Sequence, residues 1–237
     1  MMLSLAALGV AVLGIVLLAA AGPSYRAGVP LESAFAVMRW AAYIGLTGAG
    51  LGLLAVLLAR WKKKTLSVWV GAGAIVVGLG AFGIPYSWQR QAQRVPPIHD
   101  VTTDLDKPPE FVAIVPLRTE APNTLDRPPI LAAQQREGYP DLAPLTLPLP
   151  VDRVFNRALD VATRMGWEIV GSDQAAGRIE ATDTTRWFGF TDDVVIRVIP
   201  WGAGTRVDMR SASRIGRSDV GTNARRIREF LDALQAD

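Results

Sequence analysis

Three long apolar runs occupy most of the first third of this 237-residue chain, at residues 1–25, 40–59 and 66–88. None of them contains Asp, Glu, Lys or Arg. A helix needs about 20 residues to cross about 30 Å of hydrocarbon, and each run is long enough. Trp and Tyr lie near the ends of the runs, as in the aromatic belts of membrane proteins. The pattern therefore predicts a region of three transmembrane helices in residues 1–88.

The pattern after residue 150 is that of a water-soluble domain. Apolar residues recur at helical spacing over residues 151–165 and again in a last helix that begins near residue 222. Between them, four segments alternate with period two, at residues 167–171, 177–185, 193–199 and 205–213. The order predicts an α+β domain in residues 151–237, in which three or four antiparallel strands pack against two helices.

The segment between these two regions is rich in proline. Residues 95–150 hold 12 of the 16 prolines, which removes backbone donors and disfavours long helices and central strands. Two parts of it, FVAIVPL at 111–117 and ILAA at 130–133, are apolar enough to require burial. We therefore expect residues 89–150 to form an extended strap that packs on the following domain.

The charged residues give the membrane region a direction. Of 47 charged side chains (25 basic and 22 acidic), only seven lie before residue 89, and six of these are basic. Four of the six form the loop after the second apolar run: Arg60, Lys62, Lys63 and Lys64. The positive-inside rule places this loop and the N-terminus in the cytoplasm, and residues 89–237 on the periplasmic or extracellular side. The pI near 9.5 then reflects topology, and nucleic acid is not an expected partner.

Two features of the apolar runs leave alternatives open. The sequence AAAGP at positions 19–23 is typical of a signal-peptide cleavage site, but the run lacks a basic start and is longer than a signal core, which favours a retained helix. Gly48 and Gly52 are small residues four apart, which let helices approach closely. We favour packing among the three helices, with self-association through this face as the alternative. The absence of mid-membrane charges argues against a transport path.

The second face of the predicted sheet is polar. It carries charged and hydroxyl side chains from three strands: Glu180, Thr182, Arg197, Arg206, Asp208 and Arg210. Antiparallel sheets commonly leave one face in water, so a solvated face with cross-strand charge pairs is the favoured interpretation. The alternative is a polar groove that the strap covers.

Few residues are available for catalysis. The chain has no cysteine, which excludes disulfides, thiolate nucleophiles and zinc–cysteine sites, and its one histidine is His99. The segment IHDVTTD places His99 near Asp100 and Asp104, a set that could bind a divalent cation or orient a general base. Such residues more often make turn hydrogen bonds, and no serine stands in a G-x-S-x-G motif.

A second group of polar residues surrounds the end of the last predicted strand. Asp192 and Asp193 are neighbours in one strand, so they point to opposite faces, and the inward one requires an arginine partner. Where the last strand passes into the last helix, the sequence supplies Arg210, Arg214, Asp219 and Asn223. Arginines at a helix N-terminus could hold a phosphate or carboxylate. We favour the structural alternative, in which they cap the helix and pair with the aspartates.

Three blocks resemble a known family. They are IHDVTTD, GRIEATDTTRWFGFTDDVVIRV and RSASRIGRSDVGTNARRIREF. In this order they are similar to the motifs of the uncharacterised bacterial and plastid family called domain of unknown function number 1499, over about residues 95–234. The resemblance implies a domain boundary and motif positions, but no activity. The motif positions are His99, Asp100, Asp104, Asp192, Asp193, Arg210, Arg214, Asp219 and Asn223.

Two functions follow from these observations. The first is a multi-pass protein of the bacterial inner (plasma) membrane whose outward domain binds or scaffolds an envelope protein or an anionic ligand, with no cofactor. The second is a hydrolase that uses His99 with nearby carboxylates and a bound divalent cation. We favour the first because no recognisable catalytic set is present.

Overall fold

The computed structural model describes residues 1–236 and divides into two compact units. The first unit comprises residues 1–91 together with 187–189. The second comprises residues 92–186 and the described residues from 190 onward. The predicted strap therefore belongs to the same unit as the C-terminal domain.

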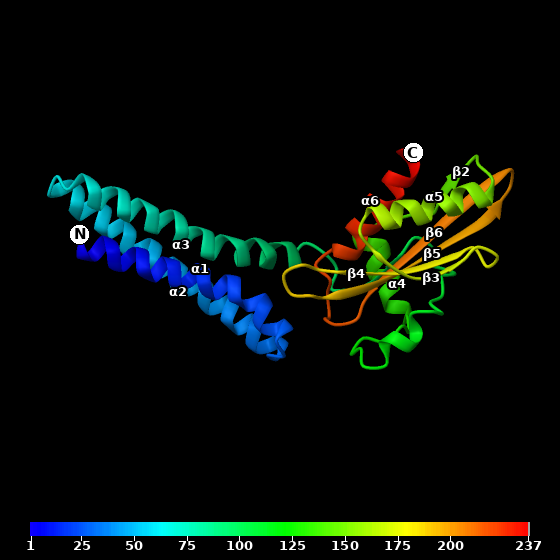
Figure 1. Cartoon of the computed structure of the whole chain (residues 1–237), viewed down its shortest axis with the longest axis horizontal. Helices are drawn as coiled ribbons and strands as arrows, with labels where there is room; N and C mark the ends of the chain where they lie inside the picture. Colours follow the sequence, from blue (N-terminus) through cyan, green and yellow to red (C-terminus); the bar gives the residue numbers. More distant parts are fainter. Residues whose placement is uncertain (237) are drawn as a thin grey trace. The chain divides into compact units, whose positions relative to one another are not determined.

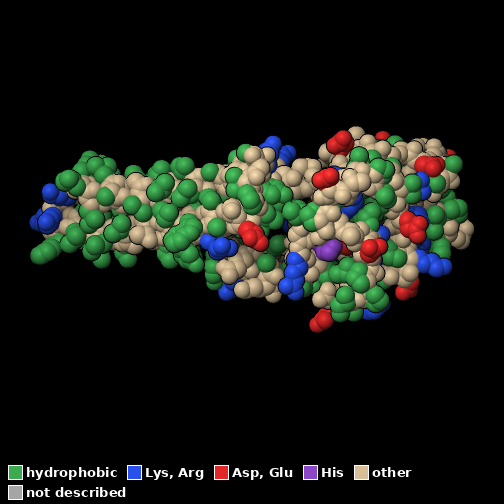
Figure 2. All heavy atoms as spheres, turned by 90° about the horizontal axis from the view of Figure 1, so that it is seen from below, with side chains coloured by type: hydrophobic (Ala, Val, Ile, Leu, Met, Phe, Trp, Pro, Cys, Tyr) green, Lys and Arg blue, Asp and Glu red, His purple; other side chains and the backbone are tan. Residues whose placement is uncertain are grey.

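The first unit contains three helices, α1 (Met2–Arg26), α2 (Leu31–Trp61) and α3 (Thr65–Ala92). All three are long and apolar enough to cross a membrane, which confirms the predicted spans by length and composition. Figure 2 shows hydrophobic side chains over most of the visible surface of these helices. Helix α3 continues to Ala92, four residues further than predicted, so the strap begins after that residue.

Small residues pack the three helices together. A methyl group added at Gly48 would lie 2.6 Å from the backbone nitrogen of Ala11 on α1. One added at Gly52 would lie 2.8 Å from the carbonyl oxygen of Gly71 on α3. Large side chains such as Leu57 are exposed on the outside. In lipid, helices associate through such close backbone approach, so the Gly48/Gly52 face is used within the chain.

The second unit is built on one antiparallel sheet of six strands. They are β1 (Asp100–Thr102), β2 (Leu145–Leu147), β3 (Glu168–Asp173), β4 (Arg178–Thr184), β5 (Thr191–Trp201) and β6 (Gly204–Ser213). The order is β1-β6-β5-β4-β3. Strand β2 pairs with a different part of β6 from the part that pairs with β1. Strands β3 to β6 are the four that the alternating pattern predicts. Strands β1 and β2 are short pieces of the strap, added at the β6 edge.

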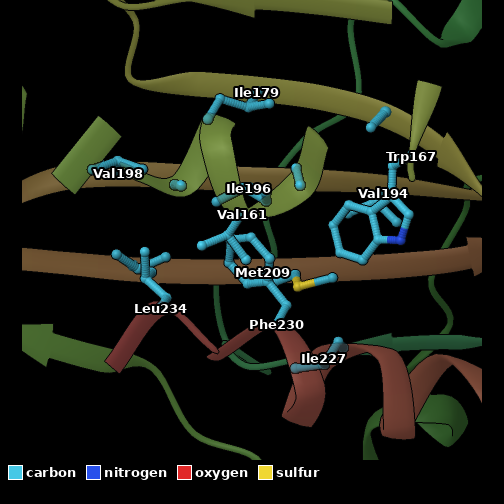
Figure 3. Close-up of a cluster of buried hydrophobic side chains, with 14 of the residues drawn as sticks. Val161, Trp167, Ile179, Val194, Ile196, Val198, Met209, Ile227, Phe230 and Leu234 are labelled. Atoms are coloured by element: carbon cyan, nitrogen blue, oxygen red, sulfur yellow. The ribbon is translucent and has the colours of Figure 1, made fainter. Parts of the chain in front are cut away.

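Two helices cover one face of the sheet, α5 (Val151–Arg164) and α6 (Thr222–Ala236) (Figure 1). The core between them is apolar and well buried, with Val161, Ile196 and Met209 among its members (Figure 3). The rings of Trp167 and Phe230 stack there at a centroid distance of 5.5 Å. The α+β class is therefore confirmed, with both predicted helices on the same side.

The strap covers the opposite face of the sheet. It contains a 3-10 helix, η1 (Val115–Arg118), and a helix that the sequence did not predict, α4 (Pro129–Gly138). Proline favours the first turn of a helix, so the pair Pro128-Pro129 begins α4 instead of preventing it. Phe111 and Ile114 pack against the sheet. The favoured expectation of a solvated face is wrong, because Glu180, Asp208 and Arg210 are buried beneath the strap.

Candidate functional site

The strap is held to the sheet by a buried carboxylate on β4. Glu180, which is only 1% exposed, accepts hydrogen bonds from the backbone N–H groups of Val112, Ala113 and Ile114 at 2.9–3.0 Å. Arg178 lies 3.1 Å from the same carboxylate. The three N–H groups precede η1 and would otherwise be unpaired, so one side chain satisfies a whole turn of the strap.

A second anchor joins η1 to the sheet at Asp193. The Asp193 carboxylate is fully buried and is bound by Arg118 from η1 at 2.5 Å and by Arg214 at 2.8 and 2.9 Å. Arg118 also donates to the carbonyl oxygens of Asn123 and Ser213. The hydrogen bonds and the charge of Asp193 raise the pKa of Arg214.

Asp100 forms a third buried cluster on this face. Its carboxylate accepts from Arg210 at 2.7–3.2 Å and from Arg127 at 3.0 Å. Arg127 also donates to Gln135 of α4, whose amide bonds both backbone groups of Thr102 in β1. One aspartate at the start of β1 thereby connects the sheet, the strap and α4.

Asp104 binds two arginines on the same face of the sheet. Its Oδ2 accepts from Arg197 at 3.0 Å and from Arg206 at 2.7 Å. Both arginines also bind the buried carboxylate of Asp208. Asp104 further accepts from the backbone N–H groups of Asp106 and Lys107, and these bonds and the arginines lower its pKa although burial alone would raise it.

The helix-covered face carries a fourth cluster. Asp192 points to this face, opposite to Asp193, as the strand alternation predicts, and lies across from Asp183 on β4. Two like charges at this position would repel, but Arg226 from α6 binds both carboxylates at 2.7 Å. Arg226 also donates to Asn223, which bonds Ser211, Ser213 and the carbonyl oxygen of His99. The N-terminal turn of α6 is therefore fastened to the sheet.

Asp219 caps that helix. Its carboxylate accepts from the backbone N–H groups of Gly221 at 2.9 Å and Asn223 at 2.6 Å. Burial raises the pKa of Asp219 above its ordinary value, and the charge of nearby Asp192 adds to this, while the two N–H groups oppose it. The preceding turn holds Val220 at φ 55°, a conformation that β-branched residues rarely adopt.

The side chain of His99 lies outside the clusters described above and lines an open cleft. The cleft has a volume of about 550 Å³, and strap residues form the rest of its lining: Pro122, Asn123, Thr124, Asp126, Arg127, Pro128 and Leu131. Burial lowers the pKa of His99, while the charge of Asp100 and a hydrogen bond to the backbone of Arg217 oppose this. The imidazole is therefore neutral at pH 7. We call this the His99 cleft.

A family model described as a protein of unknown function (DUF1499) matches residues 100–234, more than half of the chain. The chain belongs to the DUF1499 family. The resemblance of the three sequence blocks is thus confirmed, and the match begins one residue after His99. Among curated proteins, none matches the chain.

The motif residues of the DUF1499 domain fall into separate clusters. The structure joins Asp100 with Arg210, Asp193 with Arg214, and Asp219 with Asn223. It does not bring the nine candidates into one pocket. Asp192 and Asp193 lie on opposite faces of the sheet, and His99 alone among the candidates lines the His99 cleft.

Residues 1–236 show no set of side chains arranged to bind a metal ion. No group of three or more His, Asp or Glu side chains there is placed to hold a metal ion. The carboxylates nearest to His99 in sequence, Asp100 and Asp104, each bind two arginines. Such carboxylates are poor general bases because their charge is already neutralised.

The sequence reasoning missed the partners that complete these clusters in the DUF1499 domain. Arg118, Arg127 and Gln135 are strap residues whose partners lie up to 75 positions away or in another element, so no local spacing reveals them. The role of Arg226 could have been predicted from the sequence. Arg226 lies three residues after Asn223 and beside Ile227 on the buried side of α6, where an arginine requires an acid.

Proposed function

We propose that this protein is a membrane-anchored binding module whose DUF1499 domain presents the His99 cleft to the extracytoplasmic side. One observation supports binding over catalysis: the motif acids are neutralised by arginines inside the domain, whereas the His99 cleft is open and, apart from Arg127, is lined by residues outside those pairs. The buried clusters make the strap rigid, and a rigid strap gives a pre-organised binding surface.

The proposed location is the bacterial inner membrane. The four basic residues between α2 and α3 support a cytoplasmic loop and N-terminus, because no other connection of the helices carries a comparable positive charge. The DUF1499 domain then lies in the periplasm or outside the cell. Its partner in this proposal is an envelope component, while Gly48 and Gly52 serve packing within the chain in preference to self-association.

The hydrolase alternative has weaker support. It requires a carboxylate that can accept a proton or bind a cation near His99. Asp193 is held by Arg118 and Arg214, and Asp100 by Arg127 and Arg210, so neither carboxylate has a free charge. We therefore place the motif residues Asp100, Asp193, Arg210 and Arg214 in the support of the strap.

Photo-crosslinking in native membranes tests the proposed binding. The full chain carries a benzophenone amino acid at Thr124 in the His99 cleft or, as a matched control, at the exposed Asp160 on α5. We expect a discrete increase in the mass of the protein for position 124 and none for position 160. Equal labelling at both positions, or none at either, would contradict a binding role for the cleft.

A further inference from the structure

The His99 cleft displays mainly hydrogen-bond acceptors. A neutral imidazole has one N–H donor and one acceptor nitrogen. The ring of His99 lines the cleft, so it offers a ligand a hydrogen-bonding nitrogen there.

Asn123 contributes an acceptor. Its amide nitrogen donates to the carbonyl oxygens of Ser213 at 3.1 Å and Gly216 at 2.8 Å. Both N–H groups are therefore used, and they fix the side-chain amide. The amide oxygen is the atom that remains for a ligand.

Two exposed side chains complete the polar rim. The Thr124 hydroxyl and the Asp126 carboxylate both line the cleft. Arg127, the arginine in the lining, donates to Asp100 and Gln135 beneath the strap. An anion would meet one carboxylate and several acceptor atoms here, so the site disfavours anions.

The charges behind the cleft are balanced, because Arg118 is paired with Asp193 and Arg127 with Asp100. The walls are apolar, formed by Pro122, Pro128 and Leu131. The volume of about 550 Å³ falls within the range of small-molecule sites.

From this arrangement we propose that the His99 cleft binds a neutral ligand rich in hydroxyl groups, of the saccharide class. Hydroxyl groups match His99, Asn123 and Asp126, and the apolar face of a sugar ring matches the proline walls. This inference deepens the proposed binding function and rests on it.

The single histidine makes the test direct. When the full chain is labelled with ¹⁵N-histidine and embedded in lipid nanodiscs, its NMR spectrum contains the imidazole signal of one histidine. We expect N,N′-diacetylchitobiose to shift that signal in a saturable way, and putrescine and inorganic phosphate to leave it unchanged. The variant Asp126→Ala should bind the disaccharide about ten-fold more weakly, the effect of losing one hydrogen bond to a charged group. Asp160→Ala on α5 is the matched control and should bind as the wild type does.

Three outcomes would overturn the inference. No shift with the disaccharide excludes the saccharide class, and a shift with putrescine or phosphate in its place shows a site for cations or anions. A shift that Asp126→Ala leaves unchanged places the ligand outside the cleft. Each of these results is compatible with crosslinking at position 124, so failure of the ligand class is distinguishable from failure of the proposed binding function.

Discussion

At the scale of single residues, the stability of the DUF1499 domain depends on buried ion pairs. Arg210 and Asp100 have side chains exposed by only 7% and 1%, so neither charge reaches water. Removing Arg210 leaves the buried Asp100 carboxylate with Arg127 as its partner and without the three hydrogen bonds from Arg210, and the loss of one partner from a buried ion cluster costs more than the pair itself contributes. The motif arginines therefore act through the fold of the domain.

We predict that Arg210→Met destabilises the domain by about 3–5 kcal/mol, the usual cost of removing one partner of a buried pair. Thermal unfolding of the full chain in detergent, followed by circular dichroism, measures the effect. The same replacement in the exposed pair Arg225–Glu229 is the control, and Arg225→Met should change stability by about 0–1 kcal/mol. Equal effects of the two variants would show that Arg210 is not structurally required.

Asp219 predicts a pH dependence. Its pKa is raised in the folded protein, so its contribution to stability is present below the unfolded carboxyl pKa of about 3.9 and is lost as pH rises through the raised value. An asparagine side chain keeps one of the two acceptor oxygens and carries no charge, so it loses one of these hydrogen bonds at every pH but has no ionisation that burial opposes. The melting temperature of Asp219→Asn relative to wild type should therefore rise between pH 4 and pH 8.

Thermal melts of both proteins across that pH range test this prediction. A melting temperature of the variant that falls relative to wild type over this range would mean that α6 requires the negative charge of Asp219, and would contradict the assigned direction of the shift.

For a single residue, the sequence predicts the face of the sheet on which it lies but not the partner that it binds. Alternation along β5 is enough to place Asp192 and Asp193 on opposite faces and to require an arginine for the inward one. It cannot identify which arginine, because Arg118 and Arg226 come from η1 and α6. Those choices depend on the tertiary arrangement of the strap and the last helix.

At the scale of elements, the strap has little regular structure and is held to the sheet by buried carboxylates. Its turn at residues 112–114 has no ladder partner and depends on Glu180. The proline content predicted an extended strap and gave no sign of α4, β1 and β2. These short elements form because the sheet edge and the buried acids supply partners that lie far away in sequence.

We predict that Glu180→Gln loosens the strap. A glutamine amide has one acceptor oxygen in place of the two that now bind three N–H groups, so at least one N–H group loses its partner. Hydrogen exchange with mass spectrometry should show faster exchange at residues 112–114, with little change in α5. Glu168→Gln on the exposed part of β3 is the control. Unchanged exchange in both variants would remove Glu180 as the anchor.

The membrane helices give a second prediction at this scale. A methyl group at Gly78 would lie 2.8 Å from the backbone nitrogen of Ala49 on α2, whereas one at Gly73 on the same helix meets nothing within 4 Å. Gly78→Ala should lower the thermal stability of the helical unit in detergent, and Gly73→Ala should leave it unchanged or raise it, since alanine favours helix formation. Equal behaviour of the two would argue against close packing of α2 on α3.

At the scale of the whole molecule, charge and hydrophobicity separate into two units. The apolar helices carry a net charge of +5 (six basic and one acidic residue) before residue 89, and the remaining residues carry −2 (19 basic and 21 acidic). This division could be predicted from sequence because membrane insertion imposes length and charge rules on local segments. The His99 cleft could not, because its lining comes from turns of the strap.

The central claim is that the DUF1499 domain faces away from the cytoplasm. The chain has no cysteine, so single cysteines at Lys64, in the loop after α2, and at the exposed Ala203, between β5 and β6, are unique labels. A membrane-impermeant maleimide added to intact cells should label Ala203→Cys, and should label Lys64→Cys only after the membrane is permeabilised. Labelling of Lys64→Cys but not Ala203→Cys in intact cells would contradict the account.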